Sequence, residues 1–403
     1  MTRRISILGA TGSIGVSTLR LLDETHVLGE DYCLEALIGG RNVELLAEQA
    51  LKYRPAVTVL ADASQWALFK DLTKNAGLEI ACGEDAVVAA AGRKADWIMA
   101  AIVGIAGLKP TWAAAGTGAI LALANKESLV CCGRALIERV EAHGGKVLPV
   151  DSEHNAIFQV LDAAQKDRVS KLILTASGGP FRGKTRDELK HVTVEQALKH
   201  PNWTMGAKIT IDSATLANKG LEFIEAAILF DVAPDRIDVV IHPQSVIHSL
   251  VEYTDGSSLA QLGTPDMRVP ISYALGYPNR LAWQAPKLDL KALGSLTFAA
   301  PDPDAFPMLP LARQALEAGQ GTTTVYNAAN EVCVKAFLEG RIAFLQIAQF
   351  VETAMIRAQS SSISSKHHTS RDRAEAIMET ALAVDAEVRA LVAGLFATAE
   401  LGA

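Results

Sequence analysis

The sequence predicts an α/β protein that begins with a doubly wound parallel sheet, continues with an α+β domain and ends in helices. Up to about residue 150, short apolar runs alternate with helical patterns in a βαβα rhythm. From about 151 to 290 strands and helices alternate less regularly, and from 311 onward the pattern is helical. The chain has 403 residues, more than one hydrophobic core usually supports, so several domains are expected.

The first 150 residues contain six apolar runs without polar alternation, as is typical of parallel strands covered on both faces. The runs are RISILGA, CLEALIGG, AVTVLA, WIMAAIVG, AILALAN and KVLPVD. Between them, NVELLAEQALKYR and SLVCCGRALIERVEAHG follow the helical period. This order predicts a doubly wound sheet.

The next part of the chain is expected to hold five further strands and then four helices. The strands are KLILTA, KITID, RIDVVIH, SVIHSLVEYT and SSLAQLG. The last two flank Asp255-Gly256, which is a hairpin signal. Six prolines between 278 and 310 indicate an ordered connector. The helices are LARQALEAG, NAANEVCVKAFLEG, IAFLQIAQFVETAMIRA and RAEAIMETALAVDAEVRALVAGLF, with the polar insert SSSISSKHH as a loop before the last.

Composition restricts the partners and the compartment. A formal charge of −7, with 49% apolar and 21% charged residues, suits a soluble globular protein and gives no reason to expect nucleic acid or an anionic membrane as partner. A bound phosphate would need a local site. No apolar run reaches the ~20 residues of a membrane helix, and the first is too short for a signal peptide. The five cysteines contain no CxxC pair and predict thiols in the cytoplasm.

The glycines of ILGATGSIG follow the first expected strand and precede a helix. Gly9, Gly12 and Gly15 form a GxxGxxG variant of the Rossmann-type fingerprint, which lets the backbone turn tightly beside a pyrophosphate at the helix N-terminus. Thr11 and Ser13 add hydroxyl donors. The alternative is a turn without a ligand, but the strand-turn-helix context favours a dinucleotide site.

The second strand indicates which dinucleotide is bound. Proteins selective for NAD usually place Asp or Glu at its end, next to the ribose 2′-hydroxyl. Here Arg41 occupies that region and Asn42 adds an amide. A guanidinium matches a 2′-phosphate in charge and geometry, so we expect NADPH rather than NADH.

Two carboxylates flank one hydroxyl in VLPVDSEHNAIF, residues 147–158. Asp151 and Glu153 lie on either side of Ser152, directly after an apolar strand. One interpretation is a helix start, in which Asp151 or Ser152 is the cap and Glu153 faces the positive end of the helix dipole. The other is a cation held between the two acids.

A second polar group is expected on one side of a helix within residues 208–230. At about 100° per residue from Asn218, Glu222 falls near 40° and Glu225 near 340°, while Lys219 lies near 100°. A solvated helix face with a Lys219–Glu222 pair would also explain this pattern. The spacing does not decide between Glu222 and Glu225. If this face meets Asp151 and Glu153, three carboxylates converge and require a hard cation such as Mg²⁺ or Mn²⁺.

Seven long motifs together resemble the 1-deoxy-D-xylulose 5-phosphate reductoisomerase family. They are GATGSIG, LANKESLV, PVDSEHNAIFQ, SGGPFR, HPNWTMGAKITIDSATLANKGLEFIEA, IHPQSVIHSLV and YNAANEVCVKAFL. The resemblance runs from residue 4 to the C-terminal helices. It departs from the family at Thr204, where Ser is usual, and Arg41 stands where either Lys or Arg occurs. Residues 355–373 match no motif.

The resemblance implies the site residues. A divalent metal, Mg²⁺ or Mn²⁺, would be held by Asp151, Glu153 and Glu222. The substrate contacts would be Lys126, Ser152, Glu153, Ser177, His200, Ser213, Asn218, Lys219 and Glu222. Four of these, Ser177, Ser213, Asn218 and Lys219, would hold a phosphate, and the catalytic roles would fall to Lys126, Glu153 and His200. The NADPH contacts would be Thr11, Gly12, Ser13, Ile14, Gly40, Arg41, Asn42, Asn125, Glu127 and Gly206.

The resemblance also implies an activity and a domain plan. The expected reaction rearranges and reduces 1-deoxy-D-xylulose 5-phosphate to 2-C-methyl-D-erythritol 4-phosphate, in the non-mevalonate isoprenoid pathway. The expected parts are an NADPH-binding domain (1–150), a central catalytic and dimerisation domain (151–290), a connector (291–310) and a helical domain (311–403) in a homodimer. Residues 177–206 suit a lid over a reactive intermediate, because Gly-Gly-Pro and Gly206 lie near its ends and His200 and Trp203 lie within it.

Other interpretations remain open from the sequence. A metal-assisted NADP-dependent dehydrogenase of a hydroxy acid, without rearrangement, would share the glycine turn and the carboxylates. A non-catalytic NADP-binding sensor would use the helical domain for partners. His242 and His248 have an even spacing, so one strand could carry both on one face, but the hairpin context favours structural hydrogen bonding over a metal site.

Overall fold

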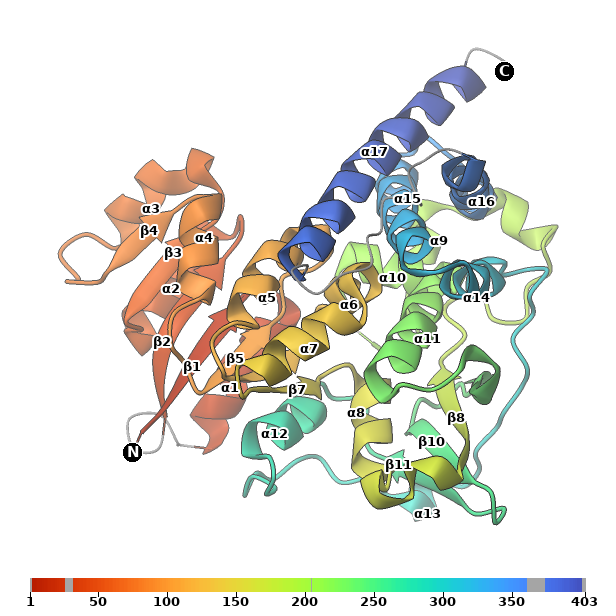
Figure 1. The fold of residues 1–403 in the computed structure, drawn as a ribbon, viewed down its shortest axis with the longest axis horizontal. Coiled ribbons are helices and arrows are strands. Elements are labelled where there is room, and N and C mark those ends of the chain that lie inside the picture. Colours follow the sequence, from red (N-terminus) through yellow and green to blue (C-terminus); the bar gives the residue numbers. More distant parts are fainter. Residues whose placement is uncertain (1, 26–31, 204, 361–373, 401–403) are drawn as a thin grey trace. The chain divides into compact units, whose positions relative to one another are not determined.

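The structure is a computed structural model that describes residues 2–25, 32–203, 205–360 and 374–400. The chain folds into two compact units, which are described separately (Figure 1). The first comprises Met1–Ser128, Arg134–Asn155 and Asp266–Ala285, and the second comprises Leu129–Gly133, Ala156–Pro265 and Pro286–Ala403. Among the described residues, no helix is both long enough and apolar enough to cross a membrane.

The first unit is built on a seven-stranded parallel sheet with the order β4-β3-β2-β1-β5-β6-β7. The strands are β1 Arg3–Leu8, β2 Tyr32–Gly39, β3 Val57–Leu60, β4 Ile80–Cys82, β5 Trp97–Ala100, β6 Ile120–Leu123 and β7 Lys146–Pro149. The predicted doubly wound sheet is therefore confirmed, and six of its strands match the six apolar runs. The edge strand β4 was not predicted, because its three residues are too few to show a pattern.

Helices accompany this sheet along the chain. They are α1 Ser13–Thr25, α2 Val43–Tyr53, η1 Ala63–Gln65, α3 Trp66–Leu72, α4 Glu84–Ala91, η2 Ile105–Gly107, α5 Leu108–Ala114, α6 Lys126–Cys132 and α7 Arg134–Ala142. The residues of α6 from Leu129 onward belong to the second unit. The sequence predicted one helix where α6 and α7 lie. The break falls at Gly133, whose φ of +57° ends α6 in a backbone conformation that favours glycine.

A later segment returns to the first unit. Helix α12, Arg268–Gly276, lies beside β7 (Figure 1). The buried Trp97 indole donates to the Ala274 carbonyl at 3.0 Å, and Arg3 donates to the Leu275 carbonyl at 2.7 Å. These bonds tie the segment after the hairpin to the sheet, although the sequence placed it with the central domain.

The second unit contains a four-stranded sheet with the order β11-β10-β8-β9. Its strands are β8 Val169–Ala176, β9 Ile237–Ile241, β10 Ile247–Tyr253 and β11 Ser258–Leu262. The hairpin predicted at Asp255-Gly256 is confirmed, because β10 and β11 are antiparallel and Gly256 has a φ of +86°. The idea that one strand carries His242 and His248 is wrong, since His242 follows β9 and His248 lies in β10.

The second unit also contains helices, which include those of the C-terminal part of the chain. They are α8 Ser152–Val160, η3 Ala163–Arg168, η4 Glu188–His191, α9 Val194–Ala197, α10 Ala207–Thr215, α11 Ala217–Phe230, η5 Pro234–Arg236, α13 Leu290–Leu293, α14 Met308–Ala318, α15 Gln320–Leu338, α16 Phe344–Ser360 and α17 Ala374–Glu400. The first residues of α8 belong to the first unit. The predicted helical end is confirmed. The polar insert begins at Ser360, the last residue of α16, and the rest of it lies outside the described residues.

The strand predicted at residues 208–212 is wrong, because this segment lies in helix α10. The alternation of Ile209 and Ile211 with polar residues indicated a strand. In the structure most of this helix is buried, namely Thr210, Ile211, Asp212, Ala214 and Thr215, so tertiary packing outweighs the β-propensity of the isoleucines. The Thr215 hydroxyl also donates back to the Ile211 carbonyl at 3.2 Å.

Gly220 lies inside helix α11, where glycine costs helix stability. Packing explains it. A Cβ at this position would lie 2.7 Å from the Ala312 Cβ of α14 and 2.7 Å from the Tyr326 hydroxyl of α15. Glycine therefore lets α11 approach both helices closely.

We expect Gly220→Ala to lower the free energy of unfolding by about 1–3 kcal/mol, because the added methyl group overpacks this contact. Urea denaturation followed by circular dichroism measures the change. Gly394→Ala is the matched control, because a methyl group added at Gly394 in α17 would have no neighbouring atom within 4 Å. There, alanine should stabilise the helix by up to about 1 kcal/mol. Equal effects of the two substitutions would contradict the packing explanation.

Candidate functional site

The site residues predicted in the first unit all follow strands of the parallel sheet. The glycine turn follows β1, Gly40 to Asn42 follow β2, Asn125 to Glu127 follow β6, and Asp151 to Glu153 follow β7. The carboxyl ends of parallel strands lie at one edge of a sheet, so these segments share that edge. The strand order reverses between β1 and β5, which is where ligands bind in such sheets.

The glycine turn leaves no room for side chains. Gly9 has a φ of +94°, and a Cβ there would lie 2.6 Å from the Ala101 carbonyl oxygen. At Gly15 a Cβ would lie 2.3 Å from the Gly9 carbonyl oxygen. The turn is fixed to β2, because the amides of Gly9 and Ala10 both donate to the Ile38 carbonyl, at 2.9 and 2.7 Å. This geometry brings bare backbone to the N-terminus of α1, where Ser13 and Ile14 lie.

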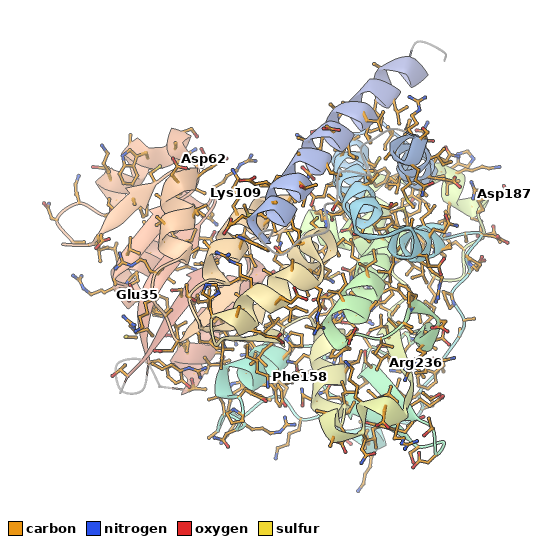
Figure 2. The ribbon with its side chains drawn as sticks, in the orientation of Figure 1. Glu35, Asp62, Lys109, Phe158, Asp187 and Arg236 are labelled. Atoms are coloured by element: carbon orange, nitrogen blue, oxygen red, sulfur yellow. The ribbon has the colours of Figure 1, made fainter. Side chains whose placement is uncertain are left out.

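The segment after β2 carries charge into this region. The Asn42 amide oxygen accepts from the Leu45 amide at 3.2 Å and caps α2, so the side chain has a structural role at the helix start. Arg41 is exposed, and its positive charge attracts the carboxylate of Asp62, which is labelled in Figure 2. The pKa of Asp62 is lowered mainly by hydrogen bonds from Ser64, with a contribution from the Arg41 charge.

Asn125 holds the loop after β5 in place. Its buried side-chain amide donates to the carbonyls of Ile102 and Gly104 at 2.6 and 3.0 Å, and to the Glu127 carboxylate at 3.2 Å. Its oxygen accepts from the Ser128 amide at 3.0 Å. The polar atoms of the side chain thus stabilise the protein itself. The sequence showed no signal for this role.

Lys126 and Asp151 form an ion pair between the start of α6 and the end of β7. Lys126 is buried and Asp151 is half-buried. Next to them the Ser152 hydroxyl donates to the Glu153 carboxylate at 2.5 Å. The helix start predicted here is confirmed, since α8 begins at Ser152. The strand end therefore presents two carboxylates, a hydroxyl and an ammonium together.

Helix α11 carries the second polar group. The Asn218 amide donates to Glu222 at 2.5 Å, and Lys219 forms an ion pair with the same carboxylate. Lys219 is 3% exposed and Glu222 is 1% exposed, so the solvated helix face considered from the sequence is wrong. Glu225 is also 1% exposed, and burial does not distinguish it from Glu222.

Helix α10 holds Ser213, and Asp212 anchors that helix. The sequence placed Asp212-Ser213 at a helix start after a strand, but both lie inside α10. The buried Asp212 carboxylate lies 2.9 Å from the Lys208 ammonium and accepts from the Asn330 amide of α15 at 2.8 Å. The sequence could not reveal this contact, because Asn330 is more than a hundred residues away.

Ser177 and His200 meet directly after β8. The His200 Nε2 lies 3.0 Å from the Ser177 hydroxyl, and the His200 Nδ1 accepts from the amides of Asn202 and Trp203. Burial lowers the pKa of His200. The Trp203 ring lies 6.4 Å from that of His248. Gly206 caps the start of α10, while Thr204 lies outside the described residues.

A cavity of about 370 Å³ opens beside this pair. Its lining includes three basic residues, Arg182, Lys184 and Lys199, together with Gly179 and Pro201. Lys184 lies 3.9 Å from the Glu188 carboxylate, so Arg182 and Lys199 are the charges that favour an anionic group here.

Comparison with known proteins shows likeness along almost the whole chain. Residues 5–133 match the profile of the 1-deoxy-D-xylulose 5-phosphate reductoisomerase family, residues 147–230 match the C-terminal domain of that enzyme, and residues 262–391 match a further DXP reductoisomerase C-terminal domain. The 1-deoxy-D-xylulose 5-phosphate reductoisomerase of Caulobacter vibrioides is 54% identical over 98% of this chain and 97% of its own length. That of Rhodospirillum centenum is 55% identical over 88% of this chain and 87% of its own.

Solved structures agree with these matches. The Zymomonas mobilis reductoisomerase in complex with NADPH is 44% identical, with a TM-score of 0.86 over 98% of this chain and 99% of that one. A DOX-P reductoisomerase in complex with NADPH, fosmidomycin and magnesium is 42% identical, with a TM-score of 0.93 over 99% of both chains. The fold and these likenesses first define the class, an oxidoreductase built on a doubly wound sheet. Within that class, the chain belongs to the 1-deoxy-D-xylulose 5-phosphate reductoisomerase family, as its motifs predicted.

Proposed function

We propose that the protein converts 1-deoxy-D-xylulose 5-phosphate to 2-C-methyl-D-erythritol 4-phosphate in the non-mevalonate isoprenoid pathway, with NADPH and a divalent metal. The observation that carries this proposal is the likeness over 99% of the chain to a reductoisomerase bound to NADPH, fosmidomycin and magnesium. The residues of both units agree with it in chemical type.

The metal ligands would be Asp151, Glu153 and Glu222. Carboxylate oxygens are the donors that Mg²⁺ and Mn²⁺ prefer, and the strand end and helix α11 each supply them beside a lysine. A bound ion would supply Lewis-acid stabilisation of the negative charge that develops on the substrate oxygens. Lys126 would add a fixed positive charge near the same oxygens.

The substrate phosphate would be held in the second unit by Ser177, Ser213, Asn218 and Lys219. Ser177 and His200 lie beside the cavity that contains Arg182, Lys184 and Lys199, so an anion would meet positive charge there. Ser152, Glu153 and Glu222 complete the proposed substrate contacts, with Lys126, Glu153 and His200 as the catalytic residues.

The NADPH contacts would come mainly from the carboxyl edge of the parallel sheet. The turn supplies Thr11, Gly12, Ser13 and Ile14, and the tight fit at Gly9 and Gly15 leaves bare backbone for a pyrophosphate. The remaining proposed contacts are Gly40, Arg41, Asn42, Asn125, Glu127 and Gly206.

The domain plan follows from these roles. We assign cofactor binding to residues 1–150, and α12 packs with them. Residues 151–290, apart from the segment 266–285 that packs in the first unit, would form the catalytic and dimerisation domain. Residues 177–206 would be a lid that excludes water, 291–310 a connector and 311–403 a helical domain. All five cysteines lie within the described residues and carry free thiols, which supports a cytoplasmic enzyme.

The decisive experiment measures NADPH oxidation with 1-deoxy-D-xylulose 5-phosphate, with and without Mg²⁺ or Mn²⁺. We expect turnover that requires both the phosphoketose and the metal. Glu222→Gln should lower kcat/KM by at least about 100-fold. Loss of a group that hydrogen-bonds to a metal ligand can already lower activity by this factor, and loss of the ligand itself should cost at least as much.

Glu352→Gln, on the exposed side of α16, is the control and should leave activity unchanged. Turnover of a phosphate-free hydroxy acid, with none of the phosphoketose, would refute the proposed reaction. Full activity of Glu222→Gln together with loss in Glu225→Gln would reassign the third carboxylate.

Arg41→Asp tests the choice of cofactor. The substitution replaces an attractive charge with a repulsive one beside the 2′-phosphate, so the KM for NADPH should rise at least about tenfold while the KM for NADH changes little. Steady-state kinetics with both cofactors measures this. Lys94→Asp makes the same charge change before β5, at the opposite edge of the sheet, and should have little effect. An unchanged preference in Arg41→Asp would remove Arg41 from the site.

A homodimer would bury the open edge of the second sheet. Strand β11 is an edge strand, and its Leu259 and Leu262 are 48% and 38% exposed. Edge strands with apolar side chains favour pairing with another chain. Sedimentation analysis should give twice the mass of the chain, and Leu259→Lys should shift the protein towards monomer. Ile356→Lys, at an exposed position of α16, should leave the dimer intact, and a monomeric wild type would contradict the proposal.

A further inference from the structure

The contacts of His200 define which of its nitrogens carries the proton. The amides of Asn202 and Trp203 donate to Nδ1 at 3.2 and 3.0 Å, so Nδ1 is an unprotonated acceptor. Since burial lowers the pKa of the ring, His200 is neutral near pH 7 and its proton lies on Nε2. That nitrogen therefore donates to the Ser177 hydroxyl at 3.0 Å.

This arrangement fixes the role of Ser177. Its oxygen accepts from His200 Nε2 and also from the Gly179 amide, at 3.1 Å. A hydroxyl has two lone pairs and one hydrogen. With both lone pairs engaged, the hydrogen of Ser177 remains for an acceptor outside this group, and a phosphate oxygen is such an acceptor.

Asn202 attaches the His200 segment to a turn of the second sheet. Its side-chain amide donates to the Pro243 carbonyl at 2.7 Å and to the Ser245 hydroxyl at 2.9 Å. Both N–H groups of the amide are thus used. Neither bond reaches the reacting groups directly, so any influence of Asn202 on them passes through the backbone of residues 200–203.

The turn that receives Asn202 is itself held firmly. The buried His242 donates from Nδ1 to the Thr297 carbonyl at 3.0 Å, accepts from the Val246 amide at Nε2 at 3.3 Å, and stacks on Phe298 with ring centroids 4.9 Å apart. These bonds confirm the structural role expected of His242.

The turn and Ser177 also share an attachment point. The His242 amide donates to the carbonyl of Ala176, the residue before Ser177, at 2.7 Å. The contacts therefore close a ring that passes through Ser177, His200, Asn202, the 243–245 turn and His242.

We infer that Asn202 is a positioning residue for the substrate phosphate. By fixing the backbone of residues 200–203 to the 243–245 turn, it keeps two amides on His200 Nδ1 and so leaves Ser177 as a hydrogen-bond donor to the phosphate. The inference rests on the proposed function, because it takes Ser177 as a phosphate ligand.

Steady-state kinetics of Asn202→Ala and Asn202→Asp test the inference. A phosphate contact acts in the ground state and the transition state alike, so we expect the KM for the phosphoketose to rise about tenfold, while kcat falls by a smaller factor because His200 is also a proposed catalytic residue. The KM for NADPH should not change. Inorganic phosphate, used as a competitive inhibitor, should lose affinity by a similar factor.

Asn202→Asp separates hydrogen bonding from packing. Aspartate has nearly the same shape, but its carboxylate does not donate to the Pro243 carbonyl. It should therefore fail as Asn202→Ala does, whereas wild-type kinetics would overturn the inference. Thr193→Ala is the control in the same segment, because it removes the cap of α9 without touching His200. An equal rise in KM for Thr193→Ala would mean that general order in the segment matters, and not the contact of Asn202.

Nuclear magnetic resonance of ¹⁵N-histidine tests the structural step without any turnover. The signals of His200, assigned by comparison with His200→Gln, should show one Nε2–H tautomer in the wild-type protein and a mixture in Asn202→Ala. Unchanged signals in the variant, or an Nδ1–H tautomer in the wild type, would refute the inference. If the wild-type enzyme does not turn over the phosphoketose, the proposed function fails, and this measurement still decides whether Asn202 sets the tautomer of His200.

A double-mutant cycle with Ser245→Ala gives a milder test, because that substitution removes one acceptor and leaves the Pro243 carbonyl. Its effect on KM should be smaller than that of Asn202→Ala. In the double variant the two effects should be less than additive, since both changes break the same contact. Additive effects would contradict the proposed attachment of Asn202 to the 243–245 turn.

Discussion

The buried pair of Lys219 and Glu222 is the interaction on which the second unit depends. Two charges removed from water cost several kcal/mol each, and their attraction compensates only when the geometry is fixed and hydrogen bonds satisfy the remaining atoms. Asn218 supplies such a bond to Glu222. Gly220, between the two charged residues, lets α11 pack directly on Ala312 and Tyr326. The close helix packing that holds the charged pair therefore requires the same glycine that weakens α11 as an isolated helix.

In the first unit, the topology of the sheet brings the polar site residues together. Each strand of a parallel sheet ends at the same edge, so short polar segments that are far apart in sequence arrive there together. Hydrophobic strands fix the edge, and the residues that follow them are free to carry chemistry. Asn125 shows the limit of that freedom, because its side chain is used to hold the loops around it.

The parts predicted from the sequence were those governed by local pattern. Six strands of the parallel sheet, the hairpin at Asp255-Gly256 and the polar side of α11 follow from periodicity and turn chemistry. The errors arose where distant contacts decide the outcome. Residues 208–212 have the alternation of a strand, but the burial of Ile211 and Ala214 and the bond from Asn330 to Asp212 favour a helix. The roles of Asn125 and Asn202 were equally hidden, since an asparagine shows nothing in sequence of the carbonyls it will meet.

Charge balance explains how a protein with a formal charge of −7 can attract anionic ligands. Lys126 and Lys219 each stand beside a carboxylate, so neither pair contributes a net positive charge. Their ammonium groups would still contact an anion directly, but attraction from a distance must come from other groups. Arg182 and Lys199 line a cavity beside Ser177, and the exposed Arg41 follows β2. His200 adds little charge near pH 7, because partial burial lowers the pKa of its ring. Its contribution is to orient the Ser177 hydroxyl. A neutral ring accepts hydrogen bonds at Nδ1 and donates one from Nε2 to Ser177, whereas a charged ring would donate from both nitrogens and could not accept the two amides.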